Sequence, residues 1–129
     1  MAVARSTGAF IGTSESSGTT IANNATSTGS EVDLLGDNTS VGWVHVYMVY
    51  DSTSSTGTID VRLNRRRLTT QAYANPVFDL SWTPANATGN KVYLGYFQVS
   101  RFVACDVKNN GLGASLTNFA LLYELEKLS

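Results

Sequence analysis

The chain has 129 residues, of which 43% are hydrophobic and 15% are charged, and its formal net charge is −1. This hydrophobic share supports one folded domain, and the length is too short for two. The charged share lies well below the usual value of about 25%. A nearly neutral chain has no global attraction to nucleic acid or to an anionic membrane, so we expect neither as a partner.

The cysteine content and the N-terminal residues limit the setting in which the protein works. Cys105 is the single cysteine, which excludes an internal disulfide and a thiolate zinc site. It lies inside an apolar run, where free cysteines are usually buried and inert. Residues 1–12 include Arg5 but no apolar h-region, so we expect no signal peptide.

Residues 1–30 differ in composition from the rest of the chain. They are rich in Ser, Thr and Gly, and Phe10 and Ile11 stand out as large apolar side chains. Such a segment buries too little apolar surface to offset its ordering entropy. We therefore predict an N-terminal arm over residues 1–30, flexible or ordered against a partner, with one strand at most near Thr19–Asn23.

From Glu31 the pattern becomes that of β-structure, in a domain predicted over residues 31–129. Residues 41–50 carry bulky side chains on both faces, as a central strand does. Residues 58–64 alternate between apolar and polar side chains. The loop at residues 51–57 between them favours a β-hairpin.

The second half of the chain continues in the same way. Residues 68–75 read as a crossing segment, and the final segment also fits a short helix, although its β-rich context favours a strand. The predicted fold is all-β, a single antiparallel β-sandwich that is jelly-roll-like, with a barrel as the alternative. Its later strands are predicted at Phe78–Trp82, Lys91–Val99, Phe102–Lys108 and Thr117–Leu128.

The alternation also predicts which side chains form the core. Residues at every second position of the predicted strands are apolar and are expected to face inward. They are Val44, Val46, Ile59, Val61, Leu63, Phe78, Leu80, Leu94, Val103, Val107 and Leu121.

Motifs that would indicate catalysis are missing from the sequence. His45 is the single histidine, and no Gly-x-Ser-x-Gly elbow accompanies it. The aspartates are scattered without a calcium-loop spacing, and there is no glycine-rich phosphate loop. We expect no enzyme activity, no cofactor and no metal site.

One dense charge feature is a candidate partner-binding site, formed by Arg62, Arg65, Arg66 and Arg67. These arginines could bind an acidic protein surface or a phosphate backbone. The alternative is a solvated loop with local partners such as Asp60 or Asp79.

Four aromatic residues suggest a second candidate site. Trp43, Trp82, Tyr93 and Tyr96 could form a platform on which a sugar ring stacks. Aromatic side chains at strand spacing are more often part of a core, which is the alternative.

Two stretches, residues 101–110 (Arg-Phe-Val-Ala-Cys-Asp-Val-Lys-Asn-Asn) and 115–118 (Ser-Leu-Thr-Asn), resemble the C-terminal part of small β-sandwich virion proteins of tailed bacteriophages. The Thr56–Val61 segment also resembles part of these proteins, and the resemblance covers residues 41–125. Head decoration (cement) proteins and minor head or tail proteins are the members concerned.

This resemblance implies a structural virion protein, made in the host cytoplasm, that lies on the capsid surface and binds and stabilises the phage head as an oligomer. Its implied partners are the major capsid protein and copies of itself, with a homotrimer favoured. The alternative function is a carbohydrate-binding β-sandwich module of a phage tail or adhesin.

Overall fold

Strands account for the regular structure of the part of the chain that the computed structural model describes, which comprises residues 3–13, 18–34, 41–66, 70, 72–73, 76, 78–99 and 101–128. These residues include no helix long and apolar enough to cross a membrane. In chain order the strands are β1 (Val3–Ile11), β2 (Thr19–Ile21), β3 (Thr26–Thr28), β4 (Val32–Asp33), β5 (Val41–Ser52), β6 (Thr58–Arg66), β7 (Phe78–Trp82), β8 (Ala87–Gln98), β9 (Phe102–Asn110) and β10 (Leu116–Leu128).

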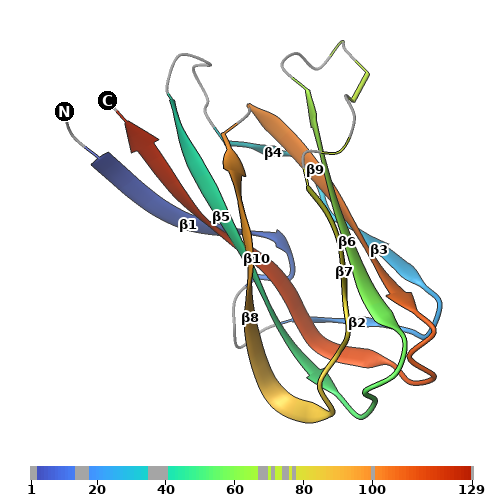
Figure 1. Cartoon of the computed structure of the whole chain (residues 1–129). Coiled ribbons are helices and arrows are strands. Elements are labelled where there is room, and N and C mark those ends of the chain that lie inside the picture. Colours follow the sequence, from blue (N-terminus) through green and yellow to red (C-terminus); the bar gives the residue numbers. More distant parts are fainter. Residues whose placement is uncertain are drawn as a thin grey trace.

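The strands form two antiparallel sheets packed face to face (Figure 1). The first sheet has the order β1-β10-β5-β8, with β2 also paired to β10, and the second has the order β3-β9-β6-β7, with β4 also paired to β9. The pairs β1–β10, β3–β9, β5–β8 and β6–β7 are nested one inside the next along the chain and alternate between the sheets. Nested antiparallel pairs wrapped into two sheets are the topology of a jelly roll, so the predicted fold class is confirmed.

The predicted hairpin of residues 41–64 is wrong, because its two strands belong to different sheets. β5 pairs with β10 and β8, whereas β6 pairs with β7 and β9. The intervening loop therefore crosses from one sheet to the other. Alternation of apolar residues identifies a strand and its inner face, but it does not choose the neighbouring strand.

The N-terminal residues also differ from the arm predicted over residues 1–30. β1 runs antiparallel to β10 from Val3 opposite Leu128, and β3 pairs with β9 in the other sheet. Phe10, Ile11 and Ile21 are buried in the core. Edge strands are held mainly by backbone hydrogen bonds, so a few apolar side chains are enough to fix this polar segment in the sandwich.

The core lies between the sheets, where most of the predicted side chains are found. Leu80 and Leu94 are half-buried, and the side chain of Phe78 lies outside the described residues. The remaining predicted residues are buried, namely Val44, Val46, Ile59, Val61, Leu63, Val103, Val107 and Leu121.

One polar side chain, that of Asn109 in β9, is fully buried in this core. Its amide nitrogen donates to the carbonyl oxygens of Ile21 at 3.0 Å and Ala114 at 2.9 Å. Its amide oxygen accepts from the backbone N–H of Leu112 at 3.4 Å. Because all these groups are paired, Asn109 joins β2 to the β9–β10 turn without leaving a buried polar atom unsatisfied.

Candidate functional site

The arginines predicted as a partner-binding site are divided between local ion pairs and solvent. Arg62 donates to Asp79 at 3.2 Å, and both side chains are more than half exposed. Arg65 is exposed, and no ion pair to it is found among the described residues. Arg67 lies outside the described residues. Asp79 was one of the local partners expected for a solvated loop, while binding of a partner by these arginines stays a prediction.

Arg66 takes part in a tighter cluster at the end of β6. Its Nε and Nη2 atoms donate to the two carboxylate oxygens of Glu31 at 2.7 and 3.0 Å. The Tyr73 hydroxyl also donates to Glu31, and the Arg66 guanidinium lies 4.7 Å from the centre of the Tyr73 ring. The hydrogen bonds from Arg66 and Tyr73 lower the pKa of Glu31. Arg66 is therefore held by its own chain.

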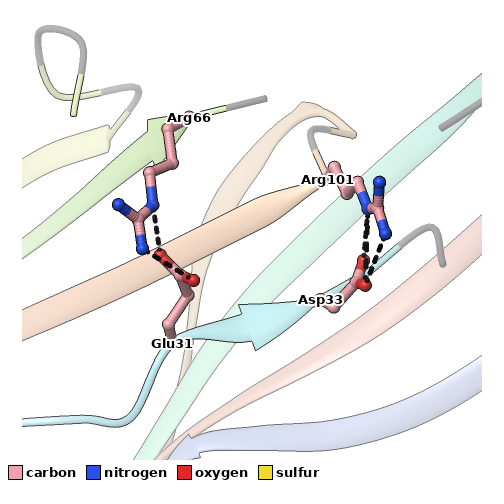
Figure 2. Close-up of polar contacts among 4 residues, drawn as sticks. All are labelled: Glu31, Asp33, Arg66 and Arg101. Atoms are coloured by element: carbon pink, nitrogen blue, oxygen red, sulfur yellow. Dashed lines mark hydrogen bonds and ion pairs between the residues drawn. The ribbon is translucent and has the colours of Figure 1, made fainter. Parts of the chain in front are cut away.

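A second ion pair lies beside the first. Arg101, just before β9, contacts Asp33 of β4 at 3.4 Å. Figure 2 shows the two pairs at opposite ends of the short strand β4, with Glu31 and Asp33 each facing an arginine from a different segment. Together the pairs fasten β4 across the end of the second sheet.

The outer edge of β1 is the most regular free strand edge in the described structure. β1 is the terminal strand of its sheet and pairs with β10 alone among the described strands. From Val3 to Ala9 it matches β10 residue for residue before the first register shift. Two other terminal strands offer less regular edges. The pairing of β8 with β5 contains two register shifts, and β7 is only 5 residues long. The backbone groups on the outer side of β1 are thus available to another strand.

A cluster of aromatic side chains occupies the outer face of the first sheet. Trp43, His45 and Tyr47 alternate along β5 with buried residues, so all three face outward. In the neighbouring strand β8, Tyr93 pairs with Tyr47 and Tyr96 pairs with His45. Tyr93 and Tyr96 therefore face outward as well.

A β-bulge makes this arrangement possible. Strict alternation would place Tyr93 and Tyr96 on opposite faces of β8, because an odd number of positions separates them. The register shifts between Val46 and Tyr47 of β5, opposite Leu94 and Gly95, and Gly95 has a φ of 142°. A bulge inserts an extra residue into one strand, and glycine adopts the required backbone conformation without steric cost.

The imidazole of His45 is held between two polar side chains. Its Nε2 atom lies 2.8 Å from Oε1 of Glu126 in β10, and its Nδ1 atom lies 2.9 Å from the Tyr93 hydroxyl. We assign the proton to Nε2, which then donates to Glu126 while Nδ1 accepts from Tyr93. Desolvation, together with Tyr96 and Glu126, raises the pKa of Tyr93, so this hydroxyl keeps its proton.

We call Trp43, His45, Tyr93, Tyr96 and Glu126 the aromatic patch. The exposed fractions are 44% for Trp43, 56% for Tyr93 and 62% for Tyr96, which are high for such large side chains. Trp43, His45, Tyr96 and Glu126 line an open cavity of about 300 Å³. This face can bind a ligand or partner through aromatic contacts and hydrogen bonds.

Three of the four aromatic residues predicted as a sugar platform meet in this patch, and the fourth does not. Trp82 lies in β7 of the other sheet and packs partly buried against the core. The sequence alone does not identify Glu126 as a neighbour of His45. Only the pairing of β10 with β5 brings these two residues together, and no local pattern encodes that pairing.

Two further features of the described residues concern Cys105 and metal binding. Burial raises the pKa of the Cys105 thiol to about 12, so the cysteine is a protonated core residue. No group of three or more His, Cys, Asp and Glu side chains placed to hold a metal ion is found in the described part of the chain.

Comparison with known proteins finds similarity at the level of structure. No family model matches the chain, and no curated protein matches it. The crystal structure of dimeric latent PorU from Porphyromonas gingivalis is similar with a TM-score of 0.46 and 14% sequence identity. The match covers 95% of this chain and 12% of the PorU chain, so the present chain spans a small fraction of that protein's length.

Proposed function

We propose that this chain is a structural protein of a bacteriophage virion, a decoration (cement) protein that binds the capsid exterior as an oligomer. The observation that best supports this proposal is the free outer edge of β1. A decoration protein needs an extended contact with neighbouring proteins rather than an active-site cleft. A free strand edge offers such a contact through strand addition, in which backbone hydrogen bonds supply affinity.

The side chains of β1 are suited to such an association. Ser6, Thr7, Gly8 and Ala9 are small, and β1 contains no proline or lysine, two residues that commonly protect an edge from pairing; Arg5 is its one charged residue. The low charge of the chain adds little repulsion between copies packed side by side. The proposed partners are the major capsid protein and further copies of this chain.

The favoured assembly is a homotrimer. In a cyclic trimer each copy contributes two different surfaces to a head-to-tail contact, which closes into a ring. The β1 edge would be one of these surfaces, or would bind the capsid beneath the ring. The predicted arginine site, with Arg65 exposed, would then steer the approach to an acidic capsid surface.

The test introduces lysines into the β1 edge. In the double variant Ser6→Lys/Thr7→Lys, the two new side chains project from opposite faces of the strand, and their charges oppose the addition of another strand. A matched control carries the same charges at the exposed positions Ser55 and Ser115, outside any strand. Capsids that lack the chain are mixed with each protein and sedimented, and light scattering after size exclusion gives the oligomer mass.

We expect the wild-type protein and the control to co-sediment with capsids and the edge variant to bind at least tenfold more weakly. All three proteins should have the same melting temperature. Failure of the wild-type protein to co-sediment would contradict the decoration role. Unchanged binding and oligomer mass in the edge variant would contradict the role of β1.

A further inference from the structure

The cavity of the aromatic patch has the composition of a small-ligand site. Its volume of about 300 Å³ lies at the lower end of the usual range for ligand pockets, about 300–1,000 Å³, which suits a ligand of one or two rings. Apolar and polar groups meet in it, because Trp43 and Tyr96 lie beside His45 and Glu126. We propose that this cavity binds a pyranose sugar.

The aromatic rings supply the apolar half of this recognition. Trp43 and Tyr96 are 5.7 Å apart between ring centres and are inclined at 82°, so they form a corner rather than a flat floor. A pyranose ring has a face of C–H groups, which the negative face of an aromatic ring attracts. One ring of the corner can stack under that face while the other contacts the sugar edge.

The polar half comes from Glu126 and His45. Oε1 of Glu126 is bound to His45, and no hydrogen bond to Oε2 is present within the described structure. A carboxylate oxygen with free lone pairs accepts hydrogen bonds from sugar hydroxyls, and such charge-assisted bonds are among the stronger ones. Both ring nitrogens of His45 are already engaged, so His45 acts as a positioning residue that holds Glu126 beside the rings.

The geometry selects a single sugar residue rather than a long flat polymer surface. The rings of the patch are mutually inclined at 36° for His45 and Tyr93 and at 45° for His45 and Tyr96. An extended chain of stacked sugars needs coplanar rings along one line, and these rings do not provide it. A terminal or branching sugar of a surface glycan fits the corner, as does a free monosaccharide.

This assignment is independent of the decoration role, because the aromatic patch lies on the outer face of the first sheet and the proposed capsid contact is the outer edge of β1. Glu126, which pairs with Arg5 of β1, is the patch residue nearest to that edge. β1 lies at one edge of the sheet order and β8 at the other, with β10 and β5 between them (Figure 1). A capsid-bound copy could therefore present the aromatic patch to solvent. Loss of sugar binding and loss of capsid binding are then separate results.

Binding is measured through tryptophan fluorescence in the variant Trp82→Phe, which leaves Trp43 as the only tryptophan. The methyl glycosides of glucose, galactose, mannose and N-acetylglucosamine are titrated individually. Immobilised bacterial surface polysaccharides are assayed in parallel, so that a free sugar is distinguished from a terminal residue of a glycan. Tyr96→Ala and Glu126→Gln are compared with the control Tyr47→Phe, which lies on the same face outside the cavity.

We expect saturable binding of at least one probe, weakened at least tenfold by Tyr96→Ala and by Glu126→Gln and unchanged by Tyr47→Phe. His45→Gln should weaken binding less than Glu126→Gln does, because His45 affects the sugar only by positioning the Glu126 carboxylate. Circular dichroism and melting curves show whether each variant is folded. The inference is overturned if no probe binds, if both cavity variants bind as the control does, or if they instead change the oligomer mass, which would assign the patch to contacts between copies.

Discussion

Tyr93 and Tyr96 project from the same outer face of β8 although strict alternation would separate them, and the bulge at Leu94 and Gly95 accounts for the difference. Their register partners in β5 are Tyr47 and His45. The bulge thus adds a second aromatic row to the row on β5. Without it, one of the two tyrosines would point into the core.

Replacement of Gly95 by alanine tests this relationship. A residue with a Cβ atom is strained at a φ of 142°, and such backbone strain costs about 1–3 kcal/mol. We expect Gly95→Ala to lower the free energy of unfolding by about that amount in a urea titration. Thr88→Ala, on the exposed part of the same strand, is the control and should change it by less than about 0.5 kcal/mol. Equal stabilities of the two variants would show that the bulge imposes no strain on a side chain.

Asn109 provides a test of the core. Replacement by alanine leaves the carbonyl oxygens of Ile21 and Ala114 without their side-chain donor inside the sandwich. An unsatisfied buried polar group costs about 1–3 kcal/mol, so we expect a loss of at least about 2 kcal/mol in chemical denaturation. The exposed neighbour Asn110 contacts Asp60, and Asn110→Ala should cost much less. A small effect at Asn109 would contradict its role in joining β2 to the β9–β10 turn.

The ion pair of Glu31 and Arg66 predicts a dependence of stability on pH. The pKa of Glu31 is lower in the folded chain than in the unfolded chain, because Arg66 and Tyr73 bind the carboxylate. A carboxyl group with a lowered pKa stabilises the fold above its unfolded pKa, which is about 4.3 for glutamate, and this stabilisation is lost as the pH falls through the folded pKa.

Melting temperatures of the wild-type protein and Glu31→Gln, measured across the acid range, check this expectation. The wild-type protein should be more stable near neutral pH, and the two curves should converge as the pH falls through the lowered pKa of folded Glu31. Asp79→Asn removes the exposed pair with Arg62 and should have a much smaller effect near neutral pH. A constant difference at all pH values would show that the carboxylate charge of Glu31 is not what stabilises the fold.

Cys105 should be unreactive in the folded protein. Burial raises the pKa of its thiol to about 12, and the thiolate is the reactive form. A thiol reagent such as Ellman's reagent, applied at about pH 8, should label the protein only after denaturant is added. Rapid labelling of the native protein would mean that the β9 face carrying Cys105 is open to solvent.

The sequence predicted the parts of the fold that depend on local patterns. Alternation located the inner faces of β5, β6 and β9, because a half-buried strand must place apolar side chains at every second residue. It did not predict that β5 and β6 lie in different sheets, nor that β1, within the Ser/Thr/Gly-rich residues 1–30, completes the first sheet. Both outcomes depend on long-range pairing, which is encoded by the packing of the whole core rather than by a local motif.

The candidate sites divide in the same way. Trp43, Tyr93 and Tyr96 were recognisable as aromatic residues on strands, but their common face depends on the bulge at Gly95. Glu126 resembled an ordinary acidic residue near the end of the chain, and only the register of β10 against β5 places it beside His45. Composition therefore indicated the residue types of the aromatic patch, while its geometry required the tertiary structure.

A reconstruction by electron cryomicroscopy of phage capsids that lack the chain, recorded before and after the purified protein is added, tests the proposed decoration role most directly. We expect additional density of jelly-roll size at symmetric positions on the capsid exterior, with β1 next to a strand of a neighbouring subunit. Capsids without added density, at protein concentrations well above those of the binding sites, would contradict it.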